Sequence, residues 1–221
     1  MRLVLFDIDK TLLDRMNPDT GKFHDCIQKV YGVRGKSITT HGMTDQQIII
    51  EILEKEGFSR KDILEKIEEC KREMIRYYRR NVRLFDYRVI DGTIDLLKAL
   101  RKEKVPTGLV TGNLETIAYI KLGRADLAKY FKFGGFGSDG IKRADLVRIA
   151  IERGQKRHGK FKKVFVIGDS PKDIEAGKAA KCITIGVATG VYSIAVLRKS
   201  RPDYVLKNLK DTERVLEIII S

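Results

Sequence analysis

The sequence predicts an α/β fold, with a doubly wound, mostly parallel (Rossmann-like) sheet and an inserted all-helical segment. Short apolar runs rich in β-branched residues, typical of buried parallel strands, alternate with amphipathic helical patterns along most of the chain. Residues from about 15 to 83 break this alternation, because they contain helical patterns and no convincing strand. We therefore expect an α/β core domain of residues 1–14 and 88–221, interrupted by a helical domain of residues 15–87.

Four apolar runs are expected to form strands of the sheet: LVLFDI near residue 3, TGLVT near 107, VFVIG near 164 and ITIGVA near 183. Helical spacing between them is clearest at residues 93–102 and 144–153. One face of a long predicted helix in the insertion carries Ile63, Ile67, Cys70, Met74 and Tyr77 at steps of three and four residues. These positions indicate helix packing rather than a cofactor pocket.

The composition is typical of a soluble globular protein. The 221 residues, 43% of them hydrophobic, can bury a full core, and no apolar run approaches the roughly 18 to 20 residues that span a membrane. The first residues pass from apolar to acidic too quickly for a signal peptide. The three cysteines are far apart and odd in number, which favours free thiols in a reducing compartment. We therefore expect a cytoplasmic protein with no membrane partner.

The formal net charge of +14 makes a nucleic-acid-binding protein an alternative hypothesis. The densest basic run, residues 153–163, offers only one aromatic residue, Phe161, for base stacking. We interpret this run as a solvated helix end and loop.

Two aspartates directly follow the first apolar run. In LVLFDIDKTLLD, Asp7 and Asp9 are placed at the carboxyl edge of the predicted sheet, where open α/β sheets bind ligands. Strand periodicity points both carboxylates the same way, and like charges so close repel each other unless a cation lies between them or one is protonated. A hard divalent cation such as Mg²⁺ would solve this problem, whereas a turn with two solvated aspartates is the alternative.

Two more strand ends carry polar groups. The second predicted strand ends in VTGN, where the Thr111 hydroxyl and the amides beside Gly112 and Asn113 suit a phosphate oxygen, although a simple Gly-Asn turn is the alternative. The run VIGDSPKD adds Asp169 and Asp173. Asp173 is also placed to stabilise the first turn of a helix that the proline begins.

A basic pair, Lys142 and Arg143, opens a predicted helix between these two strands. Either cation could reach a bound phosphate, and an exposed pair in a basic protein is the alternative. In this order, DIDKT, the VTGN threonine, the basic pair and GDSPKD resemble the motifs of the haloacid dehalogenase superfamily of phosphohydrolases, and phosphoglycolate phosphatases in particular. The resemblance covers residues 1–14 and about 89–221, and the insertion resembles the helical cap of the C1 type in that superfamily.

The resemblance implies a chemical role for each aspartate. Asp7 would be the nucleophile that forms an aspartyl-phosphate, and Asp9 would be the general acid and base. The cofactor would be Mg²⁺, bound by Asp7, Asp169 and Asp173 together with the backbone carbonyl of Asp9.

The remaining motifs would hold the phosphate. Thr111, Gly112 and Asn113 would contact its oxygens together with a cation. The register of the following helix favours Arg143, whose planar fork suits phosphate, with Lys142 as the alternative.

The resemblance implies a Mg²⁺-dependent phosphatase that acts on small phosphate monoesters. Asp9 argues against a dehalogenase, because carbon–halogen cleavage leaves no oxygen to protonate. A phosphomutase similar to β-phosphoglucomutase is the alternative enzyme. In HGMTDQQ, His41 and Thr44 are expected to select the substrate, although Thr44 also suits a helix capping box with Gln47. We expect a small phosphorylated metabolite as partner, no nucleic acid, and a monomer or homodimer.

Overall fold

The architecture is that of a computed structural model, which describes residues 1–17 and 21–221. Six strands form one sheet in the order β5-β4-β1-β6-β7-β8, and every neighbouring pair is parallel. The strands are β1 (Arg2–Phe6), β4 (Thr107–Thr111), β5 (Gly134–Phe136), β6 (Lys163–Gly168), β7 (Ile183–Val187) and β8 (Tyr204–Leu206). The predicted fold class is therefore confirmed.

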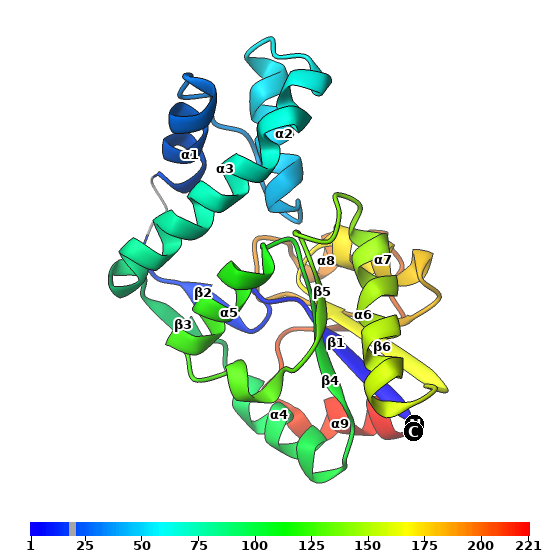
Figure 1. Cartoon of the computed structure of the whole chain (residues 1–221). Helices are drawn as coiled ribbons and strands as arrows, with labels where there is room; N and C mark the ends of the chain where they lie inside the picture. The colour runs from blue at the N-terminus through cyan, green and yellow to red at the C-terminus, as the bar shows by residue number, and fades with distance from the viewer. Residues whose placement is uncertain (18–20) are drawn as a thin grey trace.

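Both faces of the sheet are covered by helices, which explains why its strands are continuously apolar. Val4 and Phe6 of β1 face one layer, packed with α4 (Thr93–Lys102), α5 (Glu115–Arg124) and α9 (Thr212–Ile220). Leu3 and Leu5 face the opposite layer, packed with α6 (Arg143–His158) and α7 (Pro171–Ala179). A short helix, α8 (Ile194–Lys199), precedes β8 (Figure 1). These two layers place β1 in the middle of a doubly wound core.

The three central strands β1, β4 and β6 end within two residues of one another in the ladder. Phe6 of β1 lies opposite Leu109 of β4 and Ile167 of β6 in the ladder. The residues that follow these strands therefore meet at one edge of the sheet, where ligands bind in folds of this kind.

Three further helices form a separate group above that edge (Figure 1). These cap helices are α1 (Lys22–Tyr31), α2 (Asp45–Lys55) and α3 (Arg60–Asn81), and they share an apolar cluster that also includes Leu114 and Ile117 at the start of α5. The chain enters and leaves the group through an antiparallel pair of strands, β2 (Leu13–Arg15) and β3 (Tyr87–Val89). Among the described residues, the expectation of no strand from about residue 15 to 83 is therefore wrong only at its first residue, because Arg15 ends β2. The domain boundaries themselves stay a prediction.

Two short 3₁₀ helices, η1 (Val82–Leu84) and η2 (Ala128–Tyr130), complete the described elements. The basic run of residues 153–163 forms the end of α6 and the loop that follows, as predicted, and its last residue, Lys163, begins β6. All three cysteines are buried and free. In the part of the chain that the structure describes, no helix has both the length and the apolar character needed to cross a membrane.

Candidate active site

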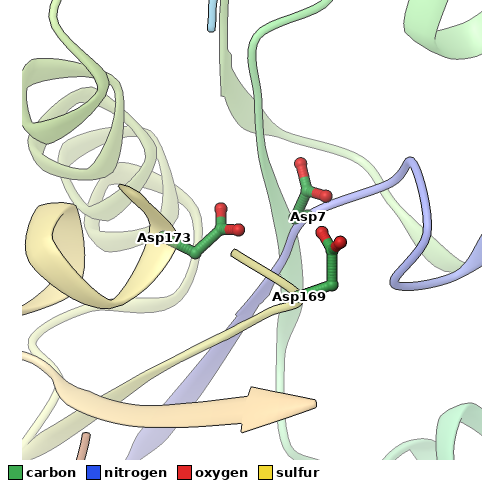
Figure 2. A group of neighbouring side chains, drawn as sticks. All are labelled: Asp7, Asp169 and Asp173. Atoms are coloured by element: carbon green, nitrogen blue, oxygen red, sulfur yellow. The ribbon is translucent and has the colours of Figure 1, made fainter. Parts of the chain in front are cut away.

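Three carboxylates from distant parts of the sequence meet at the carboxyl edge of the sheet (Figure 2). Asp7 directly follows β1, Asp169 directly follows β6, and Asp173 lies in the first turn of α7. All three side chains are buried, and each offers an oxygen within 4.8 Å of the others. The structure thus brings together the three carboxylates that the family resemblance implies as metal ligands.

The backbone around this cluster is shaped to bring the carboxylates close. Ser170 caps α7, because its Oγ accepts a hydrogen bond from the Asp173 amide while Asp173 Oδ2 accepts one from the Ser170 amide at 3.0 Å. A Cβ added at Gly168 would lie 2.3 Å from Asp173 Cγ, and one added at Gly190 would lie 1.7 Å from Asp169 Oδ2. Asp173 therefore serves both as a capping residue and as a member of the cluster.

Arg143, the first residue of α6, lies between two of these carboxylates. Its guanidinium donates to Asp7 Oδ1 at 2.5 Å and lies 2.5 Å from Asp173 Oδ1. The neighbouring Lys142 is the exposed N-cap residue of the helix and lines a second, more open pocket. Of the two candidate cations, the structure places only Arg143 against the aspartates.

Asp9 lies outside the carboxylate cluster, in a polar network on the β4 side of the site. Lys121 of α5 donates to both carboxylate oxygens of Asp9, at 2.8 and 2.7 Å. Asn113 donates through Nδ2 to Asp9 Oδ2 and to Thr111 Oγ1, both at 2.7 Å. Burial by itself would raise the pKa of Asp9, but Lys121 and Asn113 lower it to about 2. Asp9 is therefore a carboxylate in the ligand-free protein.

Residues of the predicted phosphate-binding loop form hydrogen bonds with one another and with the cap. Thr111 Oγ1 accepts hydrogen bonds from the amide and the side chain of Asn113, so the hydroxyl proton of Thr111 is left to donate toward a ligand. The carbonyl of Gly112 accepts the amide of Asp45, at the start of α2. This last contact joins the cap helices to the loop that carries Thr111.

A cavity of about 430 Å³ opens between the core and the cap helices. Its floor includes Asp7, Asp9, Thr111, Arg143 and Asp169, and its cap side includes Lys22, Phe23, His24, Ile38, His41, Met43, Ile48, Ile52 and Tyr78. Of the two predicted selecting residues, only His41 lines this cavity. Thr44 caps α2 instead, accepting from the Gln47 amide at 3.2 Å and donating to the carbonyl of Ile141. The Gln47 side chain bonds Glu51, so the capping box is only half formed.

Lys121 is the main site residue that the sequence analysis missed. One signal was available: Lys121 falls on the buried face of α5 with Ile117, Ala118 and Leu122. A lysine at such a position needs a buried partner for its charge.

The fold and the site define a class of protein: an α/β enzyme with an acidic cluster and an arginine under a helical cap. Residues 1–181 match the family of haloacid dehalogenase-like hydrolases, and the chain belongs to that family. This family match and the curated relatives described next confirm the predicted superfamily and the predicted kind of enzyme, a phosphatase-type hydrolase.

Curated relatives match along most of the chain. A phosphoglycolate phosphatase of Neisseria meningitidis is 25% identical, over 96% of this chain and 92% of that protein. The pyrophosphatase PpaX of Listeria innocua is 28% identical, over 87% of this chain and 95% of that protein. The crystal structure of a hydrolase from Pseudomonas syringae superposes with a TM-score of 0.71 at 21% identity, covering 100% of both chains, which supports the fold.

We expect the stability of the metal-free protein to fall as the pH rises from about 5 to about 8. Burial first, and then the charge of Asp173, raise the pKa values of Asp7 and Asp169 into the neutral range. Groups with raised carboxyl pKa values stabilise the fold most below their unfolded pKa of about 4, and this contribution is lost as the pH rises through the folded pKa. Asp9, with its lowered pKa, acts only below this window.

Thermal unfolding in EDTA at pH 5 and pH 8, repeated with Mg²⁺, measures this effect. Added Mg²⁺ should raise the midpoint at pH 8 and do little at pH 5, because protonated carboxylates bind it poorly. An Asp169→Asn variant should lose most of the response to Mg²⁺. Equal stabilisation by Mg²⁺ at both pH values would contradict the assignment.

Proposed function

We propose that the protein is a Mg²⁺-dependent phosphatase that hydrolyses small phosphate monoesters through an aspartyl-phosphate on Asp7. One observation carries the proposal. Asp7 lies on the cavity floor. One of its oxygens lies within 4.8 Å of oxygens of two further buried carboxylates, and Oδ1 lies 2.5 Å from the guanidinium of Arg143. A nucleophile, a set of hard oxygen donors and a phosphate-binding cation are thereby gathered in one place.

The carboxylate cluster fits a divalent cation. Asp7, Asp169 and Asp173 offer only oxygen atoms, the ligands that Mg²⁺ prefers. Burial and the neighbouring carboxylates raise the pKa values of Asp7 and Asp169, which means that negative charge is disfavoured there, although Arg143 offsets part of this effect. Bound Mg²⁺ would supply charge that shields the nucleophile from the phosphate and stabilises the transition state.

The side chains of this chain would share two chemical steps. In the first, an oxygen of Asp7 attacks phosphorus, while Arg143 and the Thr111 hydroxyl hold the phosphate oxygens and Asp9 protonates the leaving oxygen. In the second, Asp9 takes a proton from the water that attacks the aspartyl-phosphate. The Asp9 side chain is 45% exposed, on the cavity wall, so water and substrate can both reach it.

Asp9 must change its protonation state between these steps. The ligand-free protein holds the carboxylate form, which is the form that activates water. A phosphate dianion bound beside Asp9 would raise its pKa and so favour the acid form required for the first step.

We further propose that the cap helices, as part of a cap domain of residues 15–87, select a small phosphorylated metabolite over the core of residues 1–14 and 88–221. His41 supports this, because it lines the cavity and contacts the ring of Tyr192 from the core, at a centroid distance of 6.3 Å. Relatives named for phosphoglycolate and for pyrophosphate favour compact substrates of high negative charge. Closure of such a cap would exclude bulk water from the phosphate.

We expect the protein to release inorganic phosphate from p-nitrophenyl phosphate and from a subset of a phosphometabolite panel, with activity falling at least about 100-fold in EDTA and returning with Mg²⁺. Phosphate release and product identity should be measured together. Free phosphate with no isomerised ester supports a phosphatase over a mutase. Full activity in EDTA, or an isomerised sugar phosphate as the main product, would contradict the proposal.

A further inference from the structure

Lys121 is a buried charge that directly contacts the candidate general acid and base. Its side chain is 5% exposed, and its ammonium group donates to Asp9 Oδ1, Asp9 Oδ2 and Asn113 Oδ1 at 2.7 to 2.8 Å. An ammonium group has three N–H donors, so these contacts can use all of them. The contacts explain how the lysine is tolerated on the apolar face of α5.

The same contacts fix the Asp9 carboxylate from one side. Asn113 adds a third hydrogen bond, from Nδ2 to Asp9 Oδ2, and is itself tied to Thr111. Asp9 is otherwise on the cavity wall with 45% of its side chain exposed, where a carboxylate without partners would sample several rotamers. A proton donor must be held within about 3 Å of the leaving oxygen to be effective.

We propose that Lys121 is a positioning residue that holds Asp9 in the geometry for proton transfer to the leaving group. Lys121 acts through Asp9, because its donors are all directed at Asp9 and Asn113, whereas Arg143 is the cation beside the nucleophile. The inference rests on the proposed function, since it requires Asp9 to transfer the proton.

Leaving-group chemistry tests this role specifically. An alkyl phosphate expels a strongly basic alkoxide, so its first step depends on a proton from Asp9. The 2,4-dinitrophenolate leaving group is weakly basic and departs without a proton. The ratio kcat/KM reports the steps up to the first irreversible one, here formation of the aspartyl-phosphate, and so isolates proton transfer to the leaving group.

The Lys121→Met variant should lose roughly 100-fold in kcat/KM with β-glycerophosphate, and less than about 5-fold with 2,4-dinitrophenyl phosphate, in line with loss of a positioned acid. Lys121→Gln, which can keep one hydrogen bond to Asp9, should show an intermediate loss. Inhibition by inorganic phosphate should stay within about 3-fold of the wild type, because the phosphate is held by other groups. In an Asp9→Asn background, Lys121→Met should add less than about 3-fold, as expected for residues that act as one unit.

Lys71→Met is the matched control. Lys71 is 8% exposed and ion-paired with Glu68, but it lies on α3 and does not line the cavity. Its substitution should leave kcat/KM with both esters close to that of the wild type. It therefore measures the general effect of removing a buried lysine.

Three outcomes overturn the inference in distinguishable ways. Equal losses of Lys121→Met on both esters, or weakened phosphate inhibition, would show that Lys121 is structural or a phosphate ligand. If Asp9→Asn lost more kcat/KM on β-glycerophosphate than on 2,4-dinitrophenyl phosphate but neither Lys121 variant did, the positioning role of Lys121 would be rejected and that of Asp9 would stand. If Asp9→Asn lost activity equally on both esters, the role of Asp9 in proton transfer would be rejected, and the role of Lys121 with it. The proposed phosphatase activity would still stand if all turnover depended on Asp7.

Discussion

Asp7→Asn should abolish phosphate release, lowering kcat by roughly 10,000-fold or more, the scale on which the loss of a nucleophile acts. The amide that replaces the carboxylate has no anionic oxygen to attack phosphorus. Neither Asp169 nor Asp173 should substitute for Asp7, because Asp169 would be needed as a metal ligand, whereas Asp173 caps α7 and faces Arg143. Phosphate release from the most active ester of the panel, at saturating Mg²⁺, gives the measurement.

Asp145→Asn provides the matched control for this substitution. Asp145 is an exposed aspartate in the first turn of α6 and forms an ion pair with Arg148. Its replacement should change kcat by less than about 2-fold.

A trapping experiment examines the intermediate itself. Acid quenching during turnover of a labelled ester should leave a hydroxylamine-sensitive label on the wild type and none on Asp7→Asn, because an acyl-phosphate forms only on the carboxylate. Turnover by Asp7→Asn at the rate of the wild type would exclude the covalent mechanism.

The central strands could be predicted because burial on both faces leaves an unmistakable apolar pattern in β1, β4, β6 and β7. The edge strands β5 and β8 were missed, since each has only three residues. In β5 the sequence GGF argues against a strand by propensity. A Cβ added at Gly135 would lie 1.9 Å from the carbonyl oxygen of Leu146, so the close approach of α6 requires glycine there.

The carboxylate cluster could be predicted because Asp7 and Asp169 directly follow strands whose ends must meet at one edge. No such rule applies to Lys121. It lies on a helix, 112 residues from Asp9, and the face that a helix turns toward an active site is set by packing rather than by spacing. Its apolar neighbours indicated burial, but they did not indicate which charge it would meet.

Contacts between the cap helices and the core could likewise not be predicted from the sequence. The motif around Thr44 predicted a helix start correctly, yet it also suggested a residue that selects the substrate. In the structure the start of α2 is docked on the core. The Asp45 amide donates to the Gly112 carbonyl at 2.8 Å, and the Leu114 amide donates to Asp45 Oδ2 at 2.9 Å. Packing of a loop against another segment is a tertiary effect that local sequence does not encode.

Arg143→Met should lower kcat/KM by roughly 100- to 1,000-fold, the range for loss of a donor that stabilises transition-state charge. The Arg143 side chain is 10% exposed and already lies beside Asp7 and Asp173, and within the described residues its buried Nε has no hydrogen-bond partner. Arg143→Lys should recover only part of the loss, because an ammonium group lacks the planar fork.

The adjacent Lys142→Met variant separates the two candidate cations. Lys142 is exposed and does not line the cavity between core and cap, so its loss should change kcat/KM by less than about 2-fold.

The free energy of unfolding should also differ between the two variants. Arg143→Met leaves Asp7 and Asp173 buried without their cation, which costs roughly 3 to 5 kcal/mol in the metal-free protein, whereas Lys142→Met costs under about 0.5 kcal/mol. Denaturant unfolding in EDTA and steady-state kinetics with Mg²⁺ measure both effects. Equal kinetic losses in the two variants would mean that the basic pair, rather than the arginine fork, holds the phosphate.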